Sequence, residues 1–173
     1  MRGFGGTALR SLVLLALIVW LGGEIFFGAV LAPVAFWTLP TAHLAGGMVR
    51  AALVVLHRIG LGCGAVLLLL EGLEFVSRAG RERRLAAFRW GLVLGMMVLT
   101  AVSDVGVIRP MERDRLQAGG DITSLPRESA LRVDFDRRHA WSTRIEGLVV
   151  VLGLGVVGLL AVEGPRERGT VEG

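Results

Sequence analysis

The chain is divided into four long apolar blocks by short breaks and one long polar segment. The blocks cover approximately residues 11–36, 42–76, 85–108 and 141–162. About twenty apolar residues in a helix are enough to cross the hydrocarbon core of a bilayer. The pattern therefore predicts an all-α integral membrane protein, a four-transmembrane-helix bundle forming a single membrane domain over residues 1–173.

The breaks carry signals for helix ends. Pro33 should bend the last turn of the first block, and Thr41 can cap the second helix. The third block should stop before Pro110, followed by a polar connection over residues 109–140 and, after the fourth block, a cytoplasmic tail over residues 163–173. Within the connection, 112–118 is predicted to be helical up to Gly119-Gly120. The stretch 124–126 is then predicted to start another helix, so the connection between helices 3 and 4 is long and partly helical.

Composition supports the assignment to membrane proteins and argues against lysine-dependent enzymes and nucleic-acid-binding proteins. The mean hydropathy is +0.64, and all nineteen basic residues are arginine. Without lysine, the chain cannot form a Schiff base with a carbonyl substrate or pyridoxal phosphate. The pI near 11.1 would suit nucleic acid, but the arginines flank the apolar blocks as topology signals do. No recognition motif accompanies them, so nucleic-acid binding is not expected.

Arginine placement predicts the orientation. The short segment between the second and third blocks contains Arg78, Arg81, Arg83 and Arg84. Because short loops follow the positive-inside rule best, this segment and both termini should be cytoplasmic. The connection also contains many arginines, but its length and interleaved acids weaken their effect. We expect a multi-pass protein of the plasma (bacterial inner) membrane, with the first apolar block retained as a span.

Small residues favour close helix packing. Gly60-x-x-x-Gly64 and Gly91-x-x-x-Gly95 would let backbones approach each other. Such faces can pack within one chain or join copies of it. The expected partners are the lipid bilayer and either a homo-oligomer or a larger membrane complex.

Ionisable residues in the apolar blocks are the strongest functional signal. With alternating helix directions, six of them fall in the middle and outer half of the membrane: Glu24, His57, Arg58, Asp104, Arg144 and Glu146. One interpretation is a set of buried ion pairs that fix helix register, such as Arg58 with Glu24 or Asp104, and Arg144 with Glu146. The other is a water-filled vestibule that binds a cation or carries protons.

Metal and haem sites are two further alternatives. Glu24, His57 and Asp104 offer carboxylate and imidazole ligands for a divalent metal. His57 and His139 could ligate a b-type haem from two helices. No nucleophile-base constellation, phosphate loop or dinucleotide fingerprint is present, so the chain is not expected to be an enzyme.

Five stretches in order resemble the transmembrane protein 205-like family, a four-span group. They are WLGGEIFF, APVAFWTLP, HLAGGMVRAALVVLHRIG, VIRPMERDRLQ and FDRRHAWS, which together extend over most of the chain. The resemblance singles out Pro33, Phe36, Gly46, His57, Pro110, Phe135, His139 and Ser142. It implies a four-helix membrane domain with both ends on one side and a loose association with metal or drug tolerance, but no defined reaction.

Two functional hypotheses follow from these observations. The shared depth of the acids and His57 favours a small transport or tolerance module for a cation, a proton or a metal. The small size and the glycine-rich faces favour a non-catalytic structural or accessory subunit of a larger membrane complex.

Overall fold

The computed structural model describes residues 4–77 and 79–162, and this part of the chain is helical without a strand. The elements in chain order are α1 (Phe4–Phe26), η1 (Phe27–Leu31), α2 (Ala32–Thr38), α3 (Ala42–Ser77), α4 (Gly80–Val102), η2 (Ser103–Ile108), α5 (Arg109–Gln117), η3 (Ile122–Ser124) and α6 (Ala130–Val162). The predicted all-helical fold class is confirmed. The tail proposed for residues 163–173 lies outside the described residues.

Four helical segments are long and apolar enough to cross a membrane: Ala8–Thr38, Ala42–Leu73, Gly80–Gln117 and Ala130–Val162. Each predicted span falls within one continuous helical run, and each run is at least as long as its span. Large apolar side chains cover the outside of the bundle; Ile18, Leu69 and Val151, for example, are more than half exposed. Lipid is the solvent that suits such a surface, and the chain is therefore a multi-pass membrane protein.

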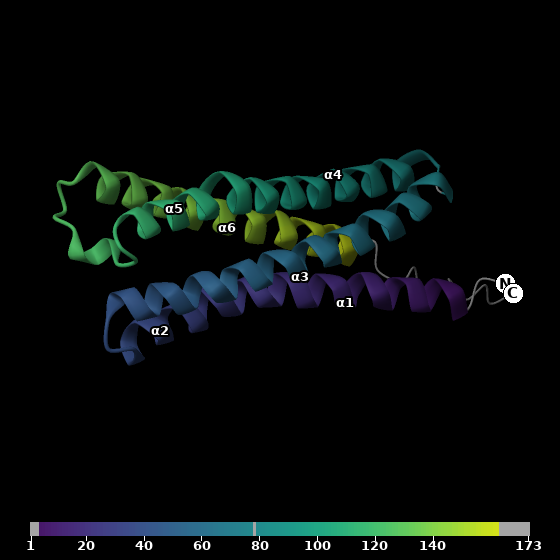
Figure 1. Cartoon of the computed structure of the whole chain (residues 1–173). Coiled ribbons are helices and arrows are strands. Elements are labelled where there is room, and N and C mark those ends of the chain that lie inside the picture. The colour runs from purple at the N-terminus through teal and green to yellow at the C-terminus, as the bar shows by residue number, and fades with distance from the viewer. Residues whose placement is uncertain (1–3, 78, 163–173) are drawn as a thin grey trace, which may run out of the picture.

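The four segments run alternately up and down the bundle (Figure 1). α3 packs between α1 and α4, and α6 packs against α4 and α1. One end, called here the hairpin end, is where α3 gives way to α4, and α1 begins and α6 ends towards it. The opposite end, called the loop end, has the α2–α3 turn, α5 and η3.

Two π-helical segments explain how the helices pass their prolines. In η1 the Ala32 N–H bonds to Phe27 O, and in η2 the Arg109 N–H bonds to Asp104 O. Each wide turn is followed one residue later by a proline, Pro33 or Pro110, whose ring would clash with the fourth preceding carbonyl of a regular helix. The third helix therefore continues through Pro110 to Gln117 instead of stopping before it.

Glycines on α3 provide the space for the largest core side chain. Trp20 of α1 is fully buried. A Cβ on Gly60 would lie 2.9 Å from Trp20 Cδ1, and one on Gly64 would lie 2.9 Å from Trp20 Cζ3. The predicted Gly60-x-x-x-Gly64 face thus packs within the chain. On α4 a Cβ at Gly95 would touch Leu152, whereas one at Gly91 would meet nothing within 4 Å.

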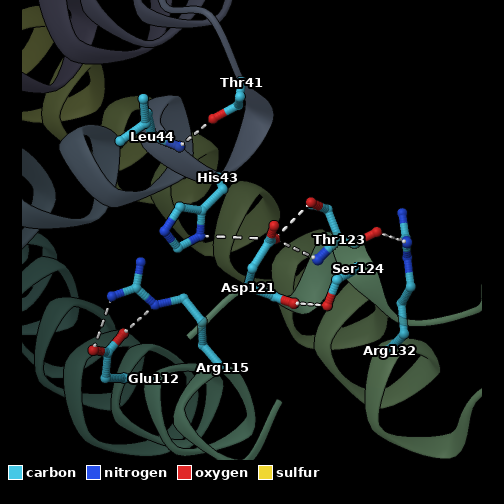
Figure 2. Close-up of polar contacts among 9 residues, drawn as sticks. All are labelled: Thr41, His43, Leu44, Glu112, Arg115, Asp121, Thr123, Ser124 and Arg132. Carbon is cyan, nitrogen blue, oxygen red and sulfur yellow. Dashed lines mark hydrogen bonds and ion pairs between the residues drawn. The ribbon is translucent and has the colours of Figure 1, made fainter. Parts of the chain in front are cut away.

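The connection between α5 and α6 is a compact, hydrogen-bonded turn (Figure 2). Gly119 and Gly120 have φ angles of 73° and 98°, a conformation that ends α5 and suits glycine. The Asp121 carboxylate accepts from the Thr123 N–H at 2.9 Å and hydroxyl at 2.6 Å. α6 begins at Ala130 rather than at the predicted 124–126, since the one-turn η3 ends before Pro126.

Candidate functional site

Glu24 is a carboxyl group enclosed within the bundle. It lies on the inner face of α1 and is only 3% exposed. Among the described residues, neither of its oxygens has a hydrogen-bond partner, and the same holds for Nε1 of Trp20, one turn earlier. A buried polar group without a partner is costly in apolar surroundings. Packing alone therefore does not account for a glutamate here.

His57, Ser103 and Glu146 form a hydrogen-bonded group next to it, supplied by α3, η2 and α6. Nε2 of His57 lies 2.9 Å from Oε1 of Glu146, and the Ser103 hydroxyl donates to the same oxygen at 2.8 Å. His57 and Ser103 are buried, and the Glu146 side chain is 13% exposed. Nδ1 of His57 and Oε2 of Glu146 have no partner in the part of the chain that is described.

Glu24 faces this group and is electrostatically coupled to it. Glu146 is the charged neighbour that repels the Glu24 carboxylate most strongly, and His57 is the neighbour that attracts it. We name Glu24, His57, Ser103 and Glu146 the buried polar cluster. Two carboxyl groups and one imidazole in an apolar bundle cannot all take their charged forms without a counter-charge. A proton or a bound cation is the simplest counter-charge.

Three of the six predicted residues lie outside this cluster. Asp104 pairs with Arg109 at 2.8 Å. Arg58 is exposed and has no ion pair with a described residue, and the Arg144 guanidinium lies 5.4 Å from the centre of the Trp141 ring. The predicted pairs of Arg58 with Glu24 or Asp104, and of Arg144 with Glu146, are therefore not formed.

Helix geometry explains why the arginines are elsewhere. Successive residues turn by about 100° around a helix axis. Arg58 directly follows the inward-facing His57, and Arg144 lies two residues before Glu146. When His57 and Glu146 point into the bundle, both arginines therefore point towards its surface, and both are exposed. Depth along the chain could be predicted from the sequence, but the face of each side chain could not.

A pocket of about 520 Å³ opens beside the cluster, between α3 and the η2–α5 segment. Its walls combine cationic, acidic and apolar side chains: Arg50, Val54, His57, Arg58, Leu61, Asp104, Ile108, Arg109 and Glu112. His57 belongs to both the pocket and the buried polar cluster. The pocket thus extends to the His57 ring of the cluster, while neither Glu24 nor Glu146 lines it.

The structure does not gather the proposed metal or haem ligands. In residues 4–77 and 79–162, no group of three His, Cys, Asp or Glu side chains is arranged to hold a metal ion. Asp104 forms an ion pair with Arg109 and does not join Glu24 and His57 in a three-ligand site. His139 is exposed on α6 and lies seven residues before Glu146, about 10 Å along the helix. The exposed His139 and the buried His57 are therefore not placed to bind the same haem iron from its two sides.

A second buried polar group, which was not predicted from the sequence, lies in the half of the bundle towards the hairpin end. Arg89 of α4 donates from Nε to both Glu71 oxygens at 3.1 and 3.0 Å, and from Nη2 at 2.7 Å. The two residues are 0% and 1% exposed. Glu71 and Arg89 are each nine residues from residue 80, where the antiparallel helix α4 begins. The two side chains are therefore expected at the same depth, and this symmetry was a sequence signal for the pair.

Most of the positions that the resemblance singles out lie in the loop-end half of the bundle. Ser142 is buried one turn before Glu146, and Pro33 and Pro110 follow the π-helical segments. Gly46 is half-buried near the start of α3, with open space around the position of a Cβ. The remaining positions are half-buried or exposed: Phe36, Phe135 and His139.

Comparison with models of known families gives a match. Residues 15–118, which extend from α1 to the end of α5 and include Glu24, His57 and Asp104, match the model of a domain of unknown function (DUF4149). No curated protein and no solved structure matches the chain. The match covers more than half of the 173 residues, and the chain therefore belongs to the DUF4149 family of domains of unknown function.

Proposed function

We propose that this protein carries protons through the membrane and that Glu24 is the carboxyl group that binds them. The observation that supports this most strongly is a buried glutamate whose two oxygens have no hydrogen-bond partner among the described residues. An ionised carboxylate in such a place requires a counter-charge. The polar groups beside it are the Trp20 indole N–H, His57 and Glu146, and none of them makes a hydrogen bond to its oxygens.

The neighbours of Glu24 favour a proton over a metal ion. His57 and Glu146 exchange protons readily as residue types, and their side chains are 2.9 Å apart. No three-ligand group for a metal exists in the described part of the chain. A metal or drug tolerance role, implied by the resemblance to the transmembrane protein 205-like family, therefore remains a prediction from sequence.

The proposed route begins in the pocket and continues through His57 to Glu146 and Glu24. Towards the hairpin end, the interior is filled by apolar side chains, including Leu17, Leu67, Val93 and Met96, and by the Glu71–Arg89 ion pair. One chain offers little room for a second polar half-channel there. We therefore propose that a second copy of the chain completes the route. No catalytic reaction is part of this function.

Proton flux in vesicles tests the proposal. The purified protein, reconstituted with a pH-sensitive dye inside the vesicles, is expected to take up protons when a potassium gradient with valinomycin makes the interior negative. Glu24→Gln removes the proton-binding carboxyl and should lower the rate at least about tenfold, to the level of empty vesicles. Glu128→Gln removes an exposed acid of the connection and should leave the rate unchanged.

Equal flux for the wild type and Glu24→Gln would contradict the proposal. A wild type without flux, purified in mild detergent with a fixed set of other proteins, would instead support the accessory-subunit hypothesis.

We further propose that the protein lies in the plasma (bacterial inner) membrane with both termini in the cytoplasm. The arginines around the α3–α4 junction support this orientation: Arg78 follows α3 in the sequence, and Arg81, Arg83 and Arg84 stand in the first turns of α4. Cys63 is the one cysteine of the chain, so a Cys63→Ala background allows one reporter cysteine at a time. A membrane-impermeant maleimide added to intact cells should label Arg127→Cys and not Arg81→Cys, and the reverse result would contradict this orientation.

A further inference from the structure

Most of the charged side chains that line the pocket are paired with one another. Arg109 pairs with Asp104 at 2.8 Å, and Arg50 pairs with Glu112 at 3.1 Å. Glu112 is also shared with Arg115 at 3.2 Å. The two acids of the pocket are therefore already engaged by other cations, and they leave Arg58 without an ion pair to any described residue.

The surroundings make this arginine unusual. Arg58 lies on α3 next to the fully buried His57 and is itself exposed at the bundle surface, in a helix that is long and apolar enough to span the membrane. A guanidinium at such a position requires a counter-anion or contact with the headgroup region. The wall of the pocket extends on α3 from Arg50 to Leu61, about 16 Å along the helix, so it includes Arg58 as well as residues nearer the loop end.

We propose that this pocket binds a phosphate-bearing anion, with Arg58 as the main ligand and Arg50 and Arg109 at the rim. A guanidinium offers planar paired donors that match phosphate oxygens. The volume of about 520 Å³ is typical of pockets for small ligands. Val54, Leu61 and Ile108 add an apolar wall to this arginine-rich site.

The phosphate can belong to a phospholipid headgroup or to a soluble ion, since both present the same oxygens to Arg58. The site is separate from the proton-binding carboxyl, because neither Glu24 nor Glu146 lines the pocket. His57 lines the pocket and lies 2.9 Å from Glu146, so a bound anion would place a negative charge beside the first residue of the proposed proton route. Anion binding itself does not depend on that route.

Two binding measurements on the full-length protein in detergent test the site. Native mass spectrometry measures retention of phosphatidylglycerol, and isothermal titration calorimetry measures binding of inorganic phosphate. Arg58→Gln should weaken binding of at least one probe about tenfold or more, because a hydrogen bond to a charged group is lost. Arg127→Gln, a change of an exposed arginine in the connection, should bind as the wild type does.

A chemical measurement on the unchanged chain removes any doubt about folding of the variant. Phenylglyoxal modifies accessible arginines, and peptide mass spectrometry gives the extent at each position. The effective probe should protect Arg58 and not Arg127. Loss of phosphatidylglycerol binding in Arg58→Gln identifies the lipid as the source, and loss of phosphate binding identifies the soluble ion.

Binding of both probes that is unaffected by Arg58→Gln, or no binding of either, would overturn the proposal. Glu24→Gln should keep full anion binding, so failure of the proton proposal and failure of this one are distinguishable.

Discussion

Glu24 and Glu71 are both buried glutamates in apolar helices, but their surroundings differ. Glu71 receives three hydrogen bonds from Arg89 within 3.1 Å. Both oxygens of Glu24 have no partner among the described residues. The first arrangement stabilises the helix pair through a matched fork, and the second leaves the carboxyl of Glu24 without a matched donor. Similar burial and equal residue type therefore have different meanings in the two halves of the bundle.

Stability measurements separate these two roles. Glu71→Met leaves Arg89 buried without its main counter-charge and should cost about 3–5 kcal/mol of unfolding free energy. Glu24→Met removes a carboxyl that makes no hydrogen bond and should cost nothing or raise stability. Unfolding of both variants in the same detergent checks the order.

The double variant Glu71→Met with Arg89→Met is the control, because it removes both charges and should recover most of the loss. We assign a structural role to Glu71 and none to Glu24. A Glu24→Met variant that is less stable than Glu71→Met would contradict this assignment.

At the scale of elements, the contact between α1 and α3 depends on a side chain that fits against glycine. A Cβ on Gly60 would crowd the buried Trp20, whereas one on Gly62 would meet nothing within 4 Å. Gly60→Ala should therefore cost about 1–3 kcal/mol by overpacking. Gly62→Ala should be neutral or gain up to about 1 kcal/mol from helix propensity. Thermal unfolding in detergent measures both, and equal effects would contradict this packing account.

The loop-end connection is an element with its own pH dependence. The hydroxyl and then the backbone N–H of Thr123 donate to Asp121, and these bonds lower the pKa of that carboxyl from its usual 3.8. His43, 3.7 Å away on α3, adds a smaller effect in the same direction (Figure 2). Because the folded pKa is the lower one, this stabilisation is complete above about pH 4 and is lost as the pH falls through the folded pKa.

Hydrogen exchange at the Thr123 amide is the corresponding measurement. Protection should be constant from about pH 7 to 5, after correction for intrinsic exchange, and should fall severalfold below about pH 4. Asp121→Asn keeps an acceptor oxygen but does not titrate, so its protection should not vary with pH. The same acid loss in Asp121→Asn would show that another group causes it.

At the scale of the whole molecule, the class and the helices could be predicted from apolar block length. Blocks of this length have few alternatives to membrane helices, because backbone groups in lipid must bond within their own helix. Pro110 was misleading, since a π-helical turn lets the helix pass it. The start of α6 was predicted too early, because the short η3 satisfies the local start signals.

The candidate site was predictable in depth but not in pairing. Glu24, His57 and Glu146 were expected at similar levels, and they do lie together. Ser103 was missed because a serine in an apolar helix gives no charge signal. Arg58 and Arg144 were assigned to ion pairs that their helix faces exclude. Contacts between helices depend on rotation about each axis, which a weakly amphipathic membrane helix does not reveal.

The central claim is that the Glu24 carboxyl binds the transported proton, and covalent modification during flux tests it most directly. An apolar carbodiimide enters the bilayer and attaches to protonated carboxyl groups, and peptide mass spectrometry identifies the modified residue. Modification of Glu24 is predicted to stop proton uptake in proportion to its extent, while modification of Glu128 has no effect. Complete modification of Glu24 with undiminished uptake would contradict the account.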